Sequence, residues 1–162
     1  MPESDPTTML IAYDGSTEAR RALTYAAELL SPRHVQIITA WEPMQRQAAR
    51  AAGAPGVSVV DWSADDGATD PAHDEALAIC REGATIAESL GLIAHAHLVE
   101  STGAIWSAIV DAAEQLHPDV IVTGTRGNTG FRSLLQSSTA DNVLHHAGLP
   151  VFIVPPLEED NE

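Results

Sequence analysis

Residues 120–155 read VIVTGTRGNTGFRSLLQSSTADNVLHHAGLPVFIVP, and this stretch decides the fold that we predict for the chain. It opens with an apolar strand, passes through a glycine-rich loop into a helix, and closes on a second apolar strand. The loop places Gly124 and Gly127 at the carboxyl end of the first strand, and Ser137 and Ser138 follow at the start of the helix. Glycines let the backbone approach a phosphate, and free N–H groups at a helix start donate to anions. The stretch therefore predicts a nucleotide phosphate site, with an ordinary glycine turn as the alternative on spacing alone.

Strands and helices alternate along the rest of the chain. Strands are expected at residues 9–13, 35–41, 94–100, 120–124 and 151–154, and helices at residues 16–30, 75–90, 104–116 and 138–147. This alternation favours a parallel sheet covered on both faces. We predict a single α/β domain over residues 9–155, a Rossmann-like three-layer sandwich with a five-stranded parallel sheet. Such sheets bind ligands at the carboxyl ends of their strands, where Asp14 and Gly124 would be neighbours.

Two segments depart from this pattern. Residues 42–74 are dominated by Pro, Gly, Ala and Asp, and we predict a long connecting loop with a short extended piece at residues 57–62. Connections of this length within a compact domain are often mobile or functional. Residues 156–162 are predicted to form an acidic tail.

The charge balance limits the possible functions. Eight Lys and Arg against 23 Asp and Glu give a formal net charge of −15, so we expect no binding to DNA or RNA. A small nucleotide remains compatible, because backbone amides and a local arginine such as Arg126 can hold it. The sequence contains no lysine. That absence excludes a lysine-dependent phosphate loop, kinase chemistry and Schiff-base catalysis.

We expect neither a signal peptide nor a membrane-spanning helix in this sequence. The first eight residues, MPESDPTT, lack the basic and apolar regions of a signal peptide, and no apolar run approaches the roughly 20 residues of a membrane helix. We therefore expect a cytoplasmic protein without a membrane partner. The single cysteine, Cys80, falls at an apolar helix position and is expected to be a core residue.

Three motifs in this order resemble those of the universal stress protein family. The family pattern G-x-x-G-x9-G-[ST] is similar to Gly124-Thr-Arg-Gly127, nine residues, and Ser137-Ser138. The family opening, a strand that leads into D-G-S, is similar to residues 11–16, IAYDGS. The family closing, a histidine-containing helix end before P-V, is similar to residues 145–151, HHAGLPV. The chain departs from the pattern at Ser137, which stands where the family has its third glycine.

The resemblance implies an adenine nucleotide alpha hydrolase-like fold and an ATP-binding regulatory module of the cellular stress response. Asp14 would bond the adenosine part, Ala12 would line the same pocket, and the Ala40 backbone would contact adenine. The phosphates would be held by Gly124, Gly127, Ser137 and Ser138, with Mg²⁺ between phosphate oxygens and no side-chain metal ligand. The resemblance further implies a homodimer through the last strand, Val151 to Val154. We expect no dedicated catalytic residue and at most slow ATP hydrolysis.

The serine at position 137 leaves open whether the chain binds a nucleotide. If its position requires a positive φ, serine costs about 1–2 kcal/mol, and otherwise it is nearly neutral. We predict retained nucleotide binding. The alternative is a stress-related interaction protein that no longer binds nucleotide and acts through its dimer surface on an unknown protein partner. An ATP pyrophosphatase-like enzyme is disfavoured, because its S-G-G-x-D-S motif is replaced here by DGSTE at residues 14–18.

Histidines and tryptophans offer weaker candidates. His95 and His97 alternate on a strand and so share a face, as two metal ligands would, but no third ligand is evident and a polar rim is the preferred interpretation. His145 and His146 are expected to stabilise the end of their helix. Trp106 is expected to be a packing residue.

Overall fold

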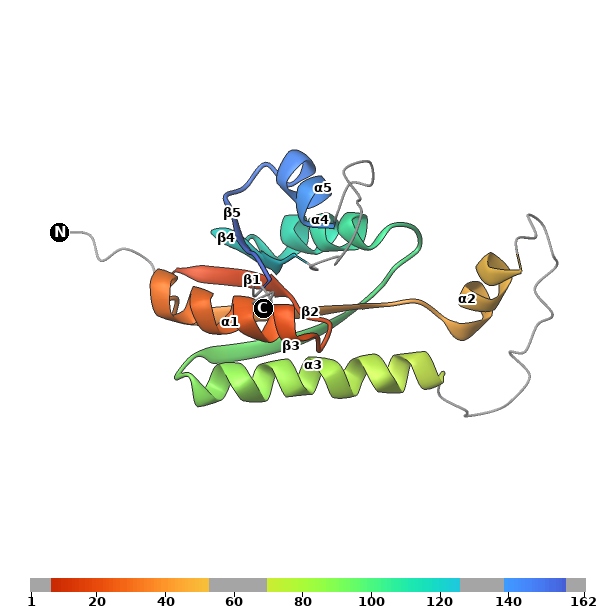
Figure 1. Cartoon of the computed structure of the whole chain (residues 1–162), viewed down its shortest axis with the longest axis horizontal. Helices are drawn as coiled ribbons and strands as arrows, with labels where there is room; N and C mark the ends of the chain where they lie inside the picture. Colours follow the sequence, from red (N-terminus) through yellow and green to blue (C-terminus); the bar gives the residue numbers. More distant parts are fainter. Residues whose placement is uncertain (1–6, 53–69, 126–138, 157–162) are drawn as a thin grey trace, which may run out of the picture.

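The computed structural model describes residues 7–52, 70–125 and 139–156, and these form one parallel sheet with helices on both faces (Figure 1). The strand order is β3-β2-β1-β4-β5, and every paired strand is parallel to its neighbour. The strands are β1 (Thr8–Ala12), β2 (His34–Trp41), β3 (Ile93–Glu100), β4 (Val120–Gly124) and β5 (Val151–Val154), and the helices are α1 (Thr17–Leu30), α2 (Met44–Ala51), α3 (Pro71–Ser89), α4 (Ile105–Leu116) and α5 (Thr139–His146). The predicted α/β class and five-stranded parallel sheet are confirmed.

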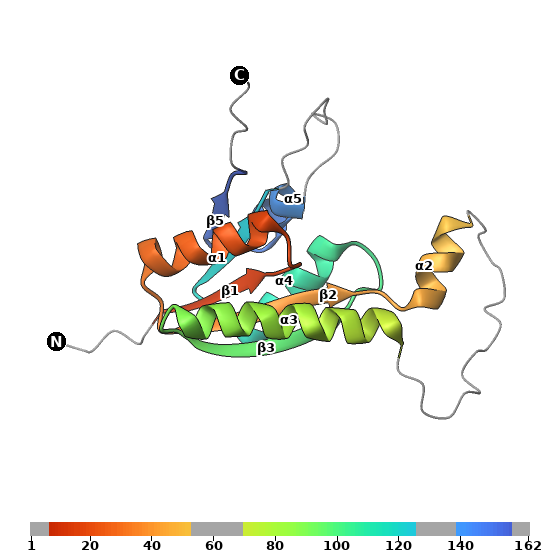
Figure 2. The ribbon, with the colours of Figure 1, turned by 60° about the horizontal axis from the view of Figure 1, so that its bottom comes forward.

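Two hydrophobic clusters lie on opposite faces of the sheet, and Figure 2 shows the helices that cover the sheet. Met9 and Ile11 of β1 belong to the cluster that includes α1 and α3, whereas Leu10 between them belongs to the cluster that includes α4 and α5. Successive side chains of a strand point to opposite faces, and β1 is buried on both because it is the central strand. The carboxyl end of β1 therefore emerges from the middle of the domain.

The predicted loop at residues 42–74 is wrong at both of its ends. Helix α2 occupies its first part and stands beyond the carboxyl end of β2 (Figure 1), and α3 begins at Pro71 rather than at residue 75. The Asp70 carboxylate accepts from the Ala72 N–H at 2.9 Å and from the Met44 N–H at 2.9 Å, so it caps α3 and also holds the start of α2. The apolar periodicity begins only after this cap. The residues Asp70 and Pro71 are themselves a typical helix start, and the predicted start at residue 75 did not take them into account. The extended piece predicted at residues 57–62 and the acidic tail beyond residue 156 lie outside the described residues.

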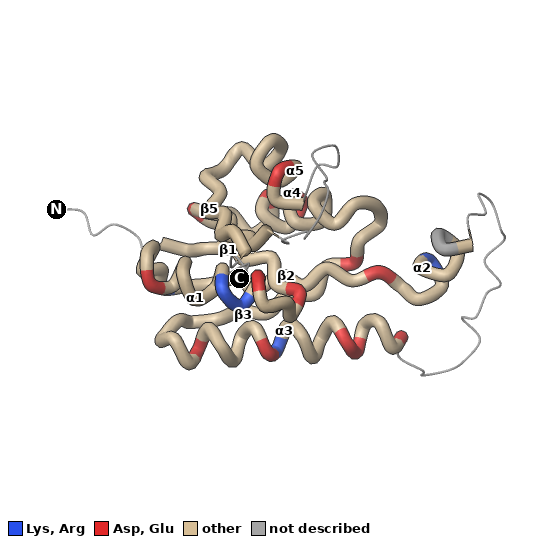
Figure 3. The backbone as a smooth tube through the Cα atoms, in the orientation of Figure 1, with Lys and Arg blue, Asp and Glu red and all other residues tan. Residues whose placement is uncertain are grey.

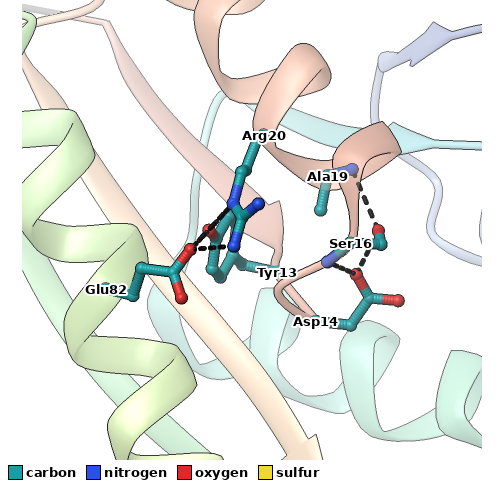
Figure 4. Close-up of polar contacts among 6 residues, drawn as sticks. All are labelled: Tyr13, Asp14, Ser16, Ala19, Arg20 and Glu82. Carbon is teal, nitrogen blue, oxygen red and sulfur yellow. Dashed lines mark hydrogen bonds and ion pairs between the residues drawn. The ribbon is translucent and has the colours of Figure 1, made fainter.

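A polar contact joins β1, α1 and α3 just beyond the end of β1. The Tyr13 ring is 1% exposed, and its hydroxyl donates to Oε1 of Glu82 on α3 at 2.9 Å. The Arg20 guanidinium on α1 donates from Nε to the same oxygen at 2.8 Å (Figure 4). The ring also packs against Gly83, where an added Cβ would lie only 2.8 Å from a ring carbon. Tyr13 therefore connects the central strand to both helices of one face.

This contact shifts the ionisation of its members. The Tyr13 hydrogen bond and, after it, the Arg20 guanidinium lower the pKa of the Glu82 carboxyl from its ordinary value. Burial is the main cause that raises the pKa of the Tyr13 hydroxyl. The folded protein therefore favours an ionised Glu82 beside a neutral Tyr13.

We expect the substitution Glu82→Gln to lower the thermal unfolding midpoint at neutral pH, by an amount that shrinks in acid. A carboxyl group with a lowered folded-state pKa stabilises the fold above its unfolded pKa of about 4.3, and this stabilisation is lost as the pH falls through the folded-state value. Calorimetric midpoints of both proteins between about pH 7 and pH 3 provide the measurement. Glu28→Gln on the exposed part of α1 is the matched control. A difference between wild type and Glu82→Gln that stays constant over this range would contradict the assignment.

Candidate functional site

The carboxyl ends of the three central strands meet at one edge of the sheet. The pairings Ala12 with Ile38 and Ile11 with Val122 align β1 with β2 on one side and with β4 on the other. The chain runs outward from β1 to β2 and β3 and then crosses back to β4. Strand order thus reverses between β1 and β4, the place where ligands bind in open parallel sheets. Asp14 lies just beyond the end of β1, and Gly124 is the last residue of β4. The two predicted neighbours therefore belong to the strands that flank this reversal.

Asp14 lies in a tight turn that starts α1. Gly15 has φ +78°, a conformation that glycine adopts without steric cost. The Asp14 carboxylate accepts hydrogen bonds through Oδ1 from the N–H of Ser16, at 3.0 Å, and from its hydroxyl (Figure 4). The Ser16 hydroxyl in turn accepts from the Ala19 N–H at 3.1 Å and caps α1. These bonds orient an exposed carboxylate at the edge of the sheet.

Two of the predicted site residues, Ala12 and Ala40, are small residues near the carboxyl ends of β1 and β2. Ala12 ends β1 with a partly buried side chain and pairs with Ile38, two residues before Ala40 in β2. The three residues that were predicted to meet the nucleoside, Ala12, Asp14 and Ala40, are thus close to one another at this edge. The structure brings them together with Gly124.

Gly124 has a packing role that the sequence analysis missed. A Cβ atom at this position would lie 2.8 Å from the carbonyl oxygen of Glu18, in the first turn of α1. The absence of a side chain therefore lets the start of α1 approach the end of β4. The glycine spacing suggested a contact with phosphate. It could not reveal the contact with α1, because Glu18 is distant from Gly124 in the sequence.

The other predicted phosphate residues, Arg126, Gly127, Ser137 and Ser138, lie outside the described residues. Their roles stay predictions. The described chain leads up to them at Thr125, whose N–H donates to the Val154 carbonyl at 3.0 Å, and resumes at Thr139 at the start of α5. Thr125 is therefore anchored to β5 where the chain leaves β4.

Buried hydroxyl groups gather at the same edge, and the sequence analysis did not single them out. Within the described part of the chain, the buried polar residues are Thr39, Ser101 and Thr123, and each lies at or just after the carboxyl end of a strand. The Thr39 hydroxyl donates to the Tyr13 carbonyl at 2.8 Å. A signal was present, since Thr39 is a polar residue between Ile38 and Ala40 in a mostly apolar strand.

The histidine pair on β3 contacts side chains of β2. The His95 ring stacks on His34 with centroids 6.2 Å apart, and His97 shares a hydrogen bond with the Gln36 amide. Burial, and then the neighbouring His95, lower the pKa of His97. Among the residues that the structure describes, no group of three His, Cys, Asp or Glu side chains is arranged to hold a metal ion. The polar-rim interpretation of His95 and His97 fits these contacts.

Trp106 packs against the end of α5. Trp106 of α4 contacts the ring of His146 at 4.5 Å between centroids, and His146 bonds the Asn142 carbonyl one turn earlier in α5. His145 lies 3.5 Å from the Asp141 carboxylate on the same helix. Cys80 is fully buried in the core, as predicted.

Acidic side chains occur on the helices of both faces (Figure 3). No helix in residues 7–52, 70–125 or 139–156 is long and apolar enough to cross a membrane. In Figure 3 the basic residues are few beside the acidic ones, which agrees with the net charge of −15.

Known structures share this architecture. A universal stress protein family protein from Arabidopsis thaliana, solved with AMP bound, superposes with a TM-score of 0.64 at 14% identity, over 97% of this chain and 96% of that one. A universal stress protein in complex with cAMP gives a TM-score of 0.64 at 24% identity, over 93% and 98% of the two chains. At these identities the similarity establishes the fold alone.

Sequence comparison identifies the family. The universal stress protein MJ0531 of Methanocaldococcus jannaschii is 38% identical over 69 residues, which are 43% of this chain and 39% of that relative. The alignment thus spans well under two thirds of the relative's length. Residues 6–155 match the family model described as the universal stress protein family, which takes in all five strands. The chain therefore belongs to the universal stress protein family.

Proposed function

We propose that this protein is a regulatory module that binds ATP, with Mg²⁺, at the carboxyl edge of its sheet. The observation that carries the proposal is the exposed Asp14 carboxylate, which Ser16 orients at the reversal of strand order between β1 and β4. The AMP and cAMP complexes of two structural relatives support an adenine nucleotide as the ligand class.

The chemistry of Asp14 sets the direction of the nucleotide. An ionised carboxylate only accepts hydrogen bonds, and it repels phosphate. Asp14 therefore faces the hydroxyl or amino groups of the nucleoside, beside the small side chains of Ala12 and Ala40. The phosphates then lie toward the end of β4, where the chain continues into Gly127 and on to Ser137 and Ser138.

Mg²⁺ belongs with the phosphates in this arrangement. The ion keeps several waters and is commonly held by phosphate oxygens rather than by a cage of protein ligands. It would also reduce the repulsion between the nucleotide and a chain of net charge −15. We assign it no side-chain ligand.

The same arrangement favours regulation over rapid turnover. We assign no residue of this chain to the activation of a water at the phosphates. Hydrolysis is therefore expected to be slow at most, and the response to stress would arise from a shift in population between bound and free states.

Calorimetric titration of the wild-type protein with ATP and Mg²⁺ tests this proposal. We expect binding in the micromolar range, and Asp14→Asn should weaken it by about tenfold or more, because a hydrogen bond to a charged group is replaced by one to a neutral amide. Asp119→Asn is the matched control, since Asp119 accepts from the Thr8 N–H at the opposite, amino edge of the sheet. Its affinity for ATP should equal that of the wild type.

A folded wild-type protein that binds no ATP, after removal of any co-purified nucleotide, would overturn the proposal. The alternative of a stress-related interaction protein without nucleotide would then take its place. Substitution of Ser137 by glycine separates the two, because restored binding in Ser137→Gly would identify the missing third glycine as the cause.

We further propose that the protein is a homodimer formed through β5. This strand is one edge of the described sheet, and Ile153 at its centre is 36% exposed. Helix α1 packs beside β5, with Arg21 bonding the Pro155 carbonyl, and presents the exposed Tyr25 and Leu29. An apolar edge strand is a natural surface for pairing with a second chain.

Sedimentation velocity provides the test of the dimer. Ile153→Glu should convert the dimer to a monomer, because it places a charge in the pairing surface of an already acidic chain. Ile93→Glu is the matched control, since Ile93 is an exposed isoleucine at the start of the opposite edge strand, β3. A wild-type monomer, or equal effects of the two substitutions, would contradict the proposed interface.

A further inference from the structure

Thr39 makes a buried contact with the peptide that leads into Asp14. Its side chain is 3% exposed near the end of β2, and its hydroxyl donates to the Tyr13 carbonyl at 2.8 Å. A buried hydroxyl is unfavourable unless it is hydrogen-bonded, and the bond to the Tyr13 carbonyl meets this requirement. The bond joins strands that are adjacent in the sheet but 26 residues apart in the sequence.

This bond fixes the peptide that precedes Asp14. The Tyr13 carbonyl belongs to the planar peptide that connects Tyr13 to Asp14, so fixing that oxygen fixes the plane from which Asp14 departs. The peptide on the other side of Tyr13 is fixed as well, because the Tyr13 N–H donates to the Ile38 carbonyl at 2.8 Å. The phenol at the far end of the same residue is held by Glu82.

We propose that Thr39 is a positioning residue of the nucleotide site: its buried hydroxyl orients the Tyr13–Asp14 peptide, so that the Asp14 carboxylate meets the nucleoside. This inference rests on the proposed function. Thr39 itself does not face the ligand, since its hydroxyl is buried against the Tyr13 backbone. It acts through Asp14, and its loss should weaken nucleotide binding more than it changes the fold.

Paired substitutions at Thr39 test the inference. Thr39→Val keeps the shape and removes the hydroxyl, and it should raise the Kd for ATP and Mg²⁺ by roughly five- to tenfold, because a displaced Asp14 loses about one hydrogen bond to the nucleoside. Thr39→Ser keeps the hydroxyl and should restore the affinity to within about twofold of the wild type. Thr85→Val is the matched control, because the Thr85 hydroxyl bonds the Arg81 carbonyl on the exposed side of α3. It should leave the Kd unchanged.

A double-mutant cycle with Asp14→Asn separates positioning from a general loss of stability. If Thr39 acts through Asp14, Thr39→Val should change the Kd by less than about twofold once Asp14 is already Asn. Additive effects of the two substitutions would overturn the inference, and so would a Thr39→Ser protein that binds as weakly as Thr39→Val. Urea unfolding confirms that each variant is folded at the temperature of titration.

Two outcomes distinguish this inference from the function on which it rests. Absence of ATP binding by the wild type overturns the proposed function and the role of Thr39 with it. Wild-type binding that Thr39→Val leaves unaltered overturns the role of Thr39 alone. If Thr39→Val does not fold, Thr39→Cys replaces it, because a thiol is a weak donor, and its Kd should lie between those of the valine and serine variants.

Discussion

Tyr13 is hydrogen-bonded through all three of its polar groups, and the arrangement of the carboxyl edge depends on these bonds. Its N–H donates to Ile38, its carbonyl accepts from Thr39, and its hydroxyl donates to Glu82. The first bond continues the backbone pairing of β1 with β2 by one residue, the second comes from a side chain of β2, and the third reaches across to α3. A residue fixed in this way defines where β1 stops and where the turn into α1 begins. The orientation of Asp14, the next residue, follows from it.

The side chains of Tyr13 and Asp14 have different surroundings. The Tyr13 ring is directed toward α3 and is buried, whereas the Asp14 carboxylate is exposed under the first turn of α1 (Figure 4). Two glycines permit this close construction, because Gly83 admits the Tyr13 ring to α3 and Gly124 admits α1 to the end of β4. A bound nucleotide would therefore meet a carboxylate on a rigid support. Preorganised groups of this kind lose little conformational entropy on binding.

The alternation of apolar strands and amphipathic helices was sufficient to predict the class of fold and the elements of the sheet, because these depend on local periodicity. The same pattern placed Asp14 and Gly124 at one edge, since parallel strands end together, whereas Ala40 was identified only through the family resemblance. It missed α2 and the true start of α3, where Asp70 links two helices that are separated in the chain. Tyr13 and Glu82 are 69 residues apart, and no local signal predicts their contact. Gly124 illustrates the same limit, because one glycine can serve both a ligand and a neighbouring helix.

The central claim is that an adenine nucleotide binds between the ends of β1 and β4. Amide chemical shifts of the isotope-labelled protein, recorded during a titration with ATP and Mg²⁺, test it most directly. We expect the largest changes among the described residues at Asp14, Gly15, Ser16, Ala40 and Thr125, with His95 and His97 on β3 unaffected. Saturable changes confined to the β3 edge, or the absence of any change at Asp14 and Thr125, would contradict it.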